Sequence, residues 1–544
     1  MENKYDVAII GAGFAGLYGL YHMRELGLKV KVFEAGTNVG GTWYWNRYPG
    51  ARVDIESLEY SFSFSDVIQQ EWVWRERYAA QPELQEYFNF VADRLDLRKD
   101  IQFNTRIESA VFDEAANKWV LKTNTGEQIE AEHCIMATGF LSAPNKPPFK
   151  GLEKFKGKQY HTATWPVEGV DFTGQRVAVI GTGSSAVQSI PFIAEQASHL
   201  HVFQRTAPYC VPLRNHPMQD EYQKRVKANY VEWRYKERYE SFGGWVAVNY
   251  QPIPLNTKSA LEVSEEERTA LYEDRWRNGG LSFYNIYPDI FTNLDANKTL
   301  SDFLRAKIRE RIKDPELAEK MMPTFPVLTK RLIGDNNYYE TFNRDNVTLV
   351  DIRNSAIDEI TEKGVRVGDQ EYEFDAIVFA TGFDALTGAL TRMDIRGRNG
   401  ATMKKHWEGG ARTYLGMMCS DFPNMYTIAA AGAPTPFFQP ILLCEEQIRW
   451  VGRCIQYLRK NDIACIEATP EGEDEWGAEC EKAVNATLFP MTDSWYIGAN
   501  VPGKPRAGLA YFGGIKNYRA ALAAALIDEF ASFKITAKKA LAEA

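Results

Sequence analysis

Several features that mark particular protein classes are missing from this sequence of 544 residues. Its seven cysteines form no CxxC pair and no regular framework, which argues against structural disulfides and favours reduced thiols in a cytoplasm. Charged residues interrupt the best apolar segment, which begins at Arg519, so no run reaches the roughly 18 apolar residues that a membrane-spanning helix needs. Metal-ligand spacings, repeats and low-complexity tracts are also missing. We therefore expect no bound metal and no membrane partner.

An excess of basic residues is missing as well. Lys and Arg number 63 against 72 Asp and Glu, a formal net charge of −9, and no long basic run occurs, so the chain is a poor candidate for binding nucleic acid. The first residues, MENKYDVAIIGAG, lack the basic, apolar and small-residue order of a signal peptide. These properties predict a cytoplasmic globular protein, and its length suggests about three to four domain-sized units.

What the sequence does contain is a nucleotide-binding pattern near its start. An apolar run ends in Gly11, Gly13 and Gly16 with GxGxxG spacing, a helical segment follows, and a second apolar run, Val30–Phe33, ends on Glu34. The glycines permit a tight turn, close approach of a pyrophosphate, and helix–strand packing, while the acid can bind a ribose. A bare GxGxxG is often only a glycine-rich turn. Strand, helix, strand and acid together predict a nucleotide site.

A second copy of this pattern carries one informative change. Gly181, Gly183 and Ala186 take the three glycine places, and Gln204, followed by Arg205, stands where the first copy has its acid. A carboxylate would repel a 2′-phosphate, whereas an arginine can pair with one. The alternative for Arg205 is a solvated loop arginine, but the loss of the acid favours NADP. We expect NADP here, and a dinucleotide with a free ribose, such as FAD, in the first copy.

The arrangement of these patterns predicts an α/β fold with two Rossmann-like dinucleotide-binding domains, one for FAD and one for NADP, and a mainly helical insertion. Two apolar strands that each end in Ala-Thr-Gly, within Ala131–Gly139 and Phe374–Asp384, bring the chain back to the nucleotides. The expected segments are 1–144 and 385–544 for the FAD domain with its substrate and lid loops, 145–214 and 331–384 for the NADP domain, and 215–330 for the insertion.

Two nucleotides together imply that hydride enters from NADPH and leaves to a second acceptor. Without a CxxC disulfide, dioxygen is the expected acceptor. A flavin C4a-peroxide lasts only where water is excluded and its charge is stabilised. Arg331, beside Lys330 in a loop, is a suitable cation because arginine keeps its proton. A lone arginine is normally a solvated surface group, so this position needs independent support.

That support comes from a family resemblance. The stretch FKGKQYHTATWP, residues 155–166, and the stretch GGTWYWNRYPGARVD, residues 40–54, resemble two signatures of the type I Baeyer–Villiger monooxygenases. The resemblance extends over about residues 6–506, and Ala186 in the third glycine place is the one departure. The matched positions are Phe155, Gly157, His161, Trp165 and Pro166 in the first signature, and Gly40, Gly41, Trp43, Tyr48, Pro49, Gly50 and Asp54 in the second.

The resemblance implies roles for individual residues. Arg331 would stabilise the peroxide, Asp54 would orient Arg331, and His161 with Trp165 would couple domain motion to catalysis. Asp54 as a turn cap, and a linker anchored by a buried Trp165, are the plainer alternatives. The expected cofactor-binding residues are Gly11, Gly13, Gly16, Glu34, Gly41, Thr42, Trp43, Asp54, Thr138, Gly181, Gly183, Ser184, Ser185, Gln188, Arg205, Thr206, Lys330 and Trp495, and the expected substrate-pocket residues are Pro434, Phe437, Phe438 and Trp495.

The implied activity is the NADPH- and O2-dependent conversion of a small-molecule ketone, not identified further, to an ester or lactone through a C4a-peroxyflavin, by a monomer or weak homo-oligomer. One rival is a flavin monooxygenase that oxygenates sulfur or nitrogen. Another is a nucleotide-binding sensor that has lost catalysis, which should have decayed at Arg331 or Asp54. A ketone panel with product identification separates these alternatives.

Overall fold

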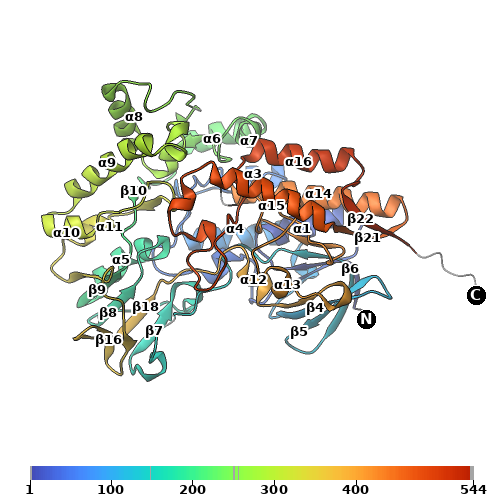
Figure 1. The fold of residues 1–544 in the computed structure, drawn as a ribbon, viewed down its shortest axis with the longest axis horizontal. Helices are drawn as coiled ribbons and strands as arrows, with labels where there is room; N and C mark the ends of the chain where they lie inside the picture. The colour runs from blue at the N-terminus through green and yellow to red at the C-terminus, as the bar shows by residue number, and fades with distance from the viewer. Residues whose placement is uncertain (1–2, 148, 249–250, 255, 436, 539–544) are drawn as a thin grey trace, which may run out of the picture.

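The computed structural model describes residues 3–147, 149–248, 251–254, 256–435 and 437–538. Two separate parallel-rich sheets, each flanked by helices, form the two halves of the molecule (Figure 1). The predicted α/β class is therefore confirmed. The central strands of both sheets are apolar and mostly buried, as expected for parallel strands covered by helices on their faces.

The first sheet has eight strands in the order β19-β4-β5-β6-β1-β2-β3, with β20 also paired to β6. The central strands are parallel, and β5 runs antiparallel to both of its neighbours. The strands are β1 (Lys4–Ile10), β2 (Val30–Phe33), β3 (Ile101–Gln102), β4 (Ile107–Asp113), β5 (Lys118–Thr123), β6 (Gln128–Met136), β19 (Asp394–Arg396) and β20 (Met425–Thr427).

Helix α1 (Phe14–Glu25) lies between this sheet and α14 (Pro440–Lys460). Gly19 marks the closest approach, because an added Cβ there would lie 3.1 Å from Ile9 Cδ1 and 3.4 Å from Ile448 Cδ1. The glycine thus lets α1 pack tightly on both elements, and it joins the start of the chain to a helix more than four hundred residues later.

The second sheet is fully parallel, with five strands in the order β14-β9-β8-β18-β7. Helix α5 (Ser184–Gln196) contacts β8 and β9 and is itself contacted by α11 (Tyr338–Thr341). The strands are β7 (Lys158–His161), β8 (Arg176–Ile180), β9 (His199–Gln204), β14 (Val347–Asp351) and β18 (Ala376–Phe379). Smaller strands flank them: β10 (Cys210–Pro212), β13 (Ile333–Asp335), β15 (Glu359–Ile360), β16 (Gly364–Val367) and β17 (Gln370–Glu373).

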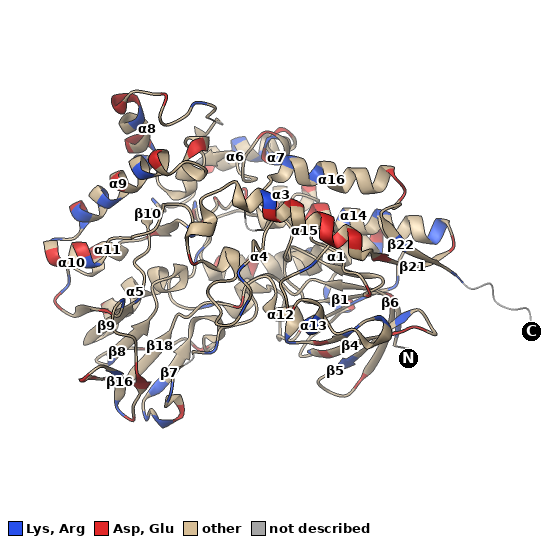
Figure 2. Cartoon of the chain, in the orientation of Figure 1, with Lys and Arg blue, Asp and Glu red and all other residues tan. Residues whose placement is uncertain are grey.

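The region between residues 215 and 330 is mainly helical. Ser264 caps α8 by accepting a hydrogen bond from Glu267 N, and Asp314 caps α10 at Glu316 N. Charges of both signs interleave along α8, α9 and α10 (Figure 2), which is typical of solvated helix faces. The elements are α6 (Asp220–Ala228), α7 (Tyr230–Tyr239), β11 (Ala247–Val248), β12 (Gln251–Pro252), α8 (Glu265–Asn278), α9 (Leu294–Arg311) and α10 (Pro315–Lys320).

This helical region belongs to two hydrophobic cores. Tyr230 and Tyr272 pack into the core that includes the first sheet, whereas Ile308 and Met321 pack into the core of the second sheet. The insertion therefore bridges both halves of the molecule. The five segment boundaries given above remain a prediction.

The remaining helices complete the first half. Strand β21 (Ile463–Ala468) pairs with β22 (Phe533–Ala537) beside α14. Across the residues placed in the structure, no helix combines the length and apolar character needed to cross a membrane. The other helices are α2 (Thr42–Trp45), α3 (Asp66–Glu71), α4 (Gln81–Arg94), α12 (Gly388–Thr391), α13 (Met403–His406), α15 (Pro470–Asn485) and α16 (Ile515–Ile527).

Candidate active site

The first glycine-rich turn is packed backbone against backbone. Gly11 has φ +105°, and an added Cβ would lie 2.5 Å from Ala137 O at the end of β6. A Cβ on Gly16 would overlap Gly11 O, and one on Gly13 would lie 3.3 Å from Gly41 Cα. Only glycine fits at positions 11 and 16, and the turn leaves the N-terminus of α1 open to a phosphate. The residues therefore fit the predicted dinucleotide.

Glu34 directly follows β2 and is buried, as expected for the ribose-binding acid. Its carboxylate already accepts hydrogen bonds from Ala12 N at 2.8 Å and Gly36 N at 2.7 Å. Burial raises the pKa of Glu34, and these backbone hydrogen bonds oppose that shift. Each oxygen keeps a second lone pair for a ribose hydroxyl, so the acid both shapes the turn and can bind the nucleotide.

The second glycine turn repeats this construction. Gly181 has φ +112°, and an added Cβ would lie 2.6 Å from Ala380 O, which follows β18. The alanine of each Ala-Thr-Gly turn thus packs against the first glycine of a nucleotide motif. Next to it, α5 begins at Ser184, and an added Cβ on Gly183 would meet no atom within 4 Å. This open helix start fits a second pyrophosphate.

The residues predicted to select NADP lie together. Gln204 is fully buried and donates from Nε2 to Lys320 O at 2.9 Å, while Arg205 is exposed at the end of β9. Burial, followed by repulsion from Arg205, lowers the pKa of Lys330, and Asp493 partly offsets the decrease. Two cations close enough to repel each other favour an anionic ligand, which fits the 2′-phosphate of NADP.

Gln188 is held by protein contacts. Its Oε1 accepts from Tyr48 OH at 2.9 Å, and its Nε2 donates to Arg52 O at 2.9 Å. A Cβ on Gly50 would overlap Gln188 O, so the segment before Asp54 docks closely on α5. Gln188 thereby joins the two halves of the molecule, a contact that its sequence context did not reveal.

Arg331 and Asp54, far apart in sequence, form an ion pair. Arg331 donates from Nε at 3.1 Å and Nη2 at 2.6 Å to the same oxygen, Asp54 Oδ2. The side chains are 22% and 29% exposed, and the guanidinium carbon lies 5.7 Å from the centre of the Tyr284 ring. Burial acts to lower the pKa of Arg331, but Asp54 more than offsets this, so the net shift is upward. The guanidinium is a permanent cation, and in the described structure its Nη1 makes no hydrogen bond.

A small cavity lies beside this pair. Trp245, Ala247 and Leu281 of the helical insertion contribute one side of it, and none of them belongs to a motif that sequence reasoning could use. The other lining residues are Asp54, Ile55, Glu56 and Tyr78. The cavity combines apolar walls with one charged edge, and its volume of about 10 Å³ is room for about one water molecule.

The residues predicted for the substrate pocket separate into two places. Phe437 stacks on Tyr496, at 5.1 Å between ring centres, and the Tyr496 ring lies tilted against Trp495, at 4.2 Å between ring centres. Phe438 is instead fully buried in the core, with the guanidinium of Arg519 5.3 Å from its ring, and Pro434 is buried as well. Residue 436 of the same loop lies outside the described residues.

The loop that carries Trp495 is docked on the second Ala-Thr-Gly turn. Asn500 Nδ2 donates to Phe383 O at 2.8 Å, and Lys504 Nζ contacts Asp384 Oδ1 at 2.9 Å. Just before Trp495, Thr492 shares a hydrogen bond of 2.7 Å with Thr329, the residue that precedes Lys330. The loop therefore lies across the end of β18 and beside Lys330.

His161 lies at the end of β7, the edge strand of the second sheet, opposite Phe379 of β18. Ala163 N donates to His161 Nδ1 at 3.1 Å, so Nε2 carries the proton and donates to Thr381 Oγ1 at 3.1 Å. Thr381 in turn donates to Asn145 O. Burial lowers the pKa of His161, which keeps the ring neutral. The hydrogen bond to Thr381 holds the second Ala-Thr-Gly turn in place. Because both ring nitrogens of His161 are already hydrogen-bonded, we assign it no role as a base.

The two aromatic residues of the signature secure opposite faces of this sheet. Phe155 packs into the core on one face, and Trp165 packs into the core on the other, 5.6 Å from Tyr160 between ring centres. A Cβ on Gly157 would lie 2.5 Å from Asp375 O, so only glycine allows β7 to approach the start of β18. The signature is thus part of the sheet and not a free connector.

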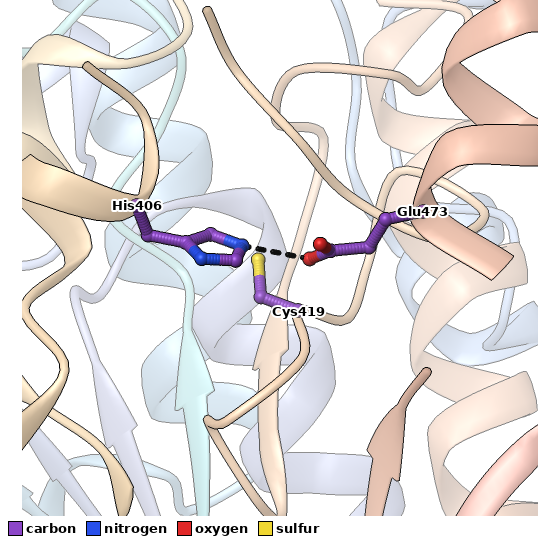
Figure 3. A group of neighbouring side chains, drawn as sticks. All are labelled: His406, Cys419 and Glu473. Atoms are coloured by element: carbon purple, nitrogen blue, oxygen red, sulfur yellow. Dashed lines mark hydrogen bonds and ion pairs between the residues drawn. The ribbon is translucent and has the colours of Figure 1, made fainter. Parts of the chain in front are cut away.

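A separate cluster joins α13 to α15 through His406, Cys419 and Glu473, whose ligand atoms lie within 4.8 Å of one another (Figure 3). Glu473 accepts from His406 Nε2 at 2.8 Å, from Ser420 N at 2.9 Å and from Ser420 Oγ at 3.0 Å. Cys419 Sγ donates to Arg412 O at 3.3 Å. These groups already satisfy one another, so the cluster is best explained as a hydrogen-bonded support between two helices.

Comparison with known proteins places these features in a family. A family described as pyridine nucleotide-disulphide oxidoreductase matches residues 8–239. Cyclohexanone 1,2-monooxygenase of an Acinetobacter species is 42% identical over 524 residues, which cover 95% of this chain and 94% of the relative. A Baeyer–Villiger monooxygenase of Pseudooceanicola batsensis is 42% identical over 535 residues, 97% and 96% of the two chains. The solved structure of an oxidized steroid monooxygenase bound to NADP has a TM-score of 0.92 at 46% identity, covering 98% of this chain and all of that one.

The chain therefore has about 42% identity to the first of these relatives over nearly its full length, and it also has both glycine turns and the ion pair between Arg331 and Asp54. The chain belongs to the Baeyer–Villiger monooxygenase family.

Proposed function

We propose that Arg331, oriented by Asp54, is the charged centre of an enzyme that converts a ketone to an ester or lactone with NADPH and O2. FAD and NADP(H) are its cofactors, and solved relatives contain both. The observation that carries the proposal is the convergence of Arg331 Nε and Nη2 on one oxygen of Asp54. This contact holds the guanidinium by one edge and leaves Nη1 as a donor.

When bound, the reduced flavin supplies electrons to O2 so that one oxygen atom can be inserted beside a carbonyl carbon. During insertion, negative charge develops on the carbonyl oxygen of the ketone. A fixed cation stabilises that charge without reorganising, and the apolar walls of Ile55, Trp245 and Leu281 exclude water, which strengthens the interaction. Arg331 suits this task because the charge of Asp54 opposes the effect of burial on the pKa of Arg331, and the net shift keeps the guanidinium protonated.

We assign the second glycine turn to NADP, with Arg205 and Lys330 holding the 2′-phosphate. The mutual repulsion of these cations supports the assignment. Trp495 would cover the nicotinamide ribose, because its loop is anchored by Asn500 and Lys504 at the end of β18. The cofactor would then remain in place during oxygen transfer.

The substrate we propose is a small, largely apolar ketone. Relatives are named for cyclohexanone, cyclopentanone and acetone, and these names support the proposal. A second candidate activity is oxygenation of a heteroatom, because one relative is named phenazine N-monooxygenase.

A panel of cyclic ketones, linear ketones, a sulfide and an aromatic amine, with products identified by mass spectrometry, tests both activities. We expect esters or lactones in proportion to the NADPH consumed. Formation of only sulfoxide or N-oxide would overturn the ketone assignment in favour of the second activity.

We also propose a cytoplasmic enzyme that acts as a monomer or weak homo-oligomer. The seven cysteines are free and buried, which suits a reducing compartment. The proposed division into five segments is supported by the strands of the second sheet, which all come from residues 145–214 and 331–384. Light scattering after size-exclusion chromatography measures the oligomeric state.

A further inference from the structure

Tyr48 lies at the contact between the two halves of the molecule. Its hydroxyl donates to Gln188 Oε1 at 2.9 Å, and Gln188 Nε2 donates to Arg52 O at 2.9 Å. Both polar atoms of this side chain of α5 are therefore bound to the segment 48–54 of the first half. A Cβ added to Gly50 would lie 2.3 Å from Gln188 O, so the two backbones also touch at a position between these hydrogen bonds.

Helix α5 is also the helix whose start is open to a pyrophosphate. It begins at Ser184, and Gln188 follows four residues later on the same side of the helix. Burial raises the pKa of Tyr48 to about 12, a hydrogen bond to Ser185 opposes the rise, and the negative charge of Asp54 adds to it. The phenol of Tyr48 is thus bonded to the beginning of α5 and lies within electrostatic range of Asp54.

The chain just before Asp54 is also held on its other side. Ala51 and Val53 form backbone hydrogen bonds of 2.9 and 3.1 Å with residues 79–81. Within the described residues, the only hydrogen bonds that the carboxylate of Asp54 receives come from Arg331. The position of Asp54 therefore depends on the backbone before it, which is held between α5 and residues 79–81.

We propose that Tyr48 is a positioning residue: by fixing the segment before Asp54 to the NADP-binding helix, it aligns the Asp54–Arg331 pair with the cofactor. The inference rests on the proposed function, in which Arg331 is the charged centre and α5 binds NADP. Asp54 orients the guanidinium correctly only if its own segment is correctly placed relative to both nucleotides. Tyr48 provides that placement across the boundary between the two halves.

The test removes the hydroxyl of Tyr48 alone. Tyr48→Phe keeps the ring, so the hydrogen bond to Gln188 is lost with little change in packing. The change is made in the parent and in Asp54→Asn, which gives a double-mutant cycle. For each FAD-loaded protein, oxygenated product and hydrogen peroxide are measured per NADPH consumed. Isothermal titration calorimetry gives the Kd of NADP+, and the melting temperature is recorded.

Tyr272→Phe is the matched control. The hydroxyl of Tyr272 also shares one hydrogen bond, 2.7 Å from Thr299 Oγ1, but it belongs to α8, and its described ring contacts are with Tyr287 and Phe303. This change should lower the melting temperature, whereas the product yield and the Kd of NADP+ should stay at their parental values.

We expect Tyr48→Phe to lower the product yield per NADPH by roughly three- to tenfold, the effect of losing one hydrogen bond, with hydrogen peroxide appearing instead. The Kd of NADP+ should stay at the parental value, because the glycine turn and the start of α5 are unchanged. Because Tyr48 acts through Asp54, adding Tyr48→Phe to Asp54→Asn should lower the yield no further.

An unchanged yield in Tyr48→Phe would overturn the inference. A loss of equal size in the Asp54→Asn background would also overturn it, because Tyr48 would then act independently of Asp54. A Kd of NADP+ that rises as much as the yield falls would place Tyr48 in cofactor binding instead, with the same consequence.

Gln188→Met provides a second variant if Tyr48→Phe does not fold. It removes both hydrogen bonds with a neutral side chain of similar length, and the yields in the parent and Asp54→Asn backgrounds decide as before. The parent enzyme separates the two levels of the argument. A parent that forms no oxygenated product contradicts the proposed function and this inference with it, whereas an active parent with a parental yield in Tyr48→Phe removes only the role of Tyr48.

Discussion

Replacing Arg331 by alanine separates charge stabilisation from the earlier transfer of hydride. The guanidinium is held at 3.1 and 2.6 Å by Asp54 Oδ2, and it lies beside the cavity and not on either glycine turn. Binding of both cofactors should therefore survive the change. Consumption of NADPH should continue, because reduction of the flavin does not need this cation.

The magnitude follows from the loss of one preorganised donor at a developing negative charge, which costs about 2.7–4 kcal/mol, or roughly 100- to 1,000-fold in rate. We expect ester yield per NADPH to fall by at least about 100-fold in Arg331→Ala, with hydrogen peroxide appearing instead. Asp54→Asn keeps the cation and a neutral acceptor, so a smaller loss of about tenfold is expected.

The assay measures NADPH consumption, ester and hydrogen peroxide in the same reaction, together with bound FAD. Arg24→Ala is the matched control, because Arg24 is also a partly exposed, ion-paired arginine, with Asp100 at 3.4 Å, but it does not line the cavity. The control should give the parental ester yield. A normal ester yield from Arg331→Ala would refute the assignment, and loss of NADPH consumption in the same variant would place Arg331 in the reduction step instead.

Three further predictions concern other parts of the molecule. Arg205→Ala should weaken NADPH binding by roughly tenfold or more while NADH use changes little, as measured by steady-state KM; an equal effect on both cofactors would contradict the phosphate assignment. His161→Ala should slow turnover with FAD still bound, because it loses the hydrogen bond to Thr381 beside the second nucleotide site; rapid-mixing kinetics that are normal in every step would argue against this. His133 is 3% exposed, and burial lowers its pKa from 6.5 to about 3. The unfolded chain therefore binds a proton below pH 6.5 that the folded chain does not, so stability is lost as pH falls, by about 2 kcal/mol at pH 5. Melting temperatures from pH 7 to pH 5 should fall less steeply in His133→Asn, and parallel curves would exclude His133 as the source.

Local patterns in the sequence were sufficient to predict the two sheets and their glycine turns. Gly11 and Gly181 occur in short strand–turn–helix segments whose geometry is set by neighbouring residues. The position of Glu34 was predicted in the same way. Its hydrogen bonds to Ala12 N and Gly36 N were not, because they depend on how the turn folds back on the end of β2.

The cavity wall could not be predicted, because it depends on contacts between distant segments. Trp245 and Ala247 line the cavity, and Ala247 N donates to Glu59, nearly two hundred residues earlier, although no local pattern links these positions. Gln188 shows the same limit, since Tyr48 and Arg52 approach it from the other half of the molecule. The pairing of Arg331 with Asp54 was expected from family resemblance alone, and the structure supplies its geometry.

The strand order has a consequence for how the protein is made. Every strand of the second sheet lies between Lys158 and Phe379, whereas the first sheet needs β20 at Met425–Thr427, and α1 packs on α14 beyond it. As the chain leaves the ribosome, the second sheet is therefore complete while the first still lacks its last strands. The N-terminal glycine turn emerges first, but β20 and α14, which complete its sheet and pack on its helix, are synthesised more than four hundred residues later. Flavin capture thus becomes a late step in biosynthesis, and truncation after residue 400 should yield protein that has formed the NADP-binding sheet but cannot retain FAD.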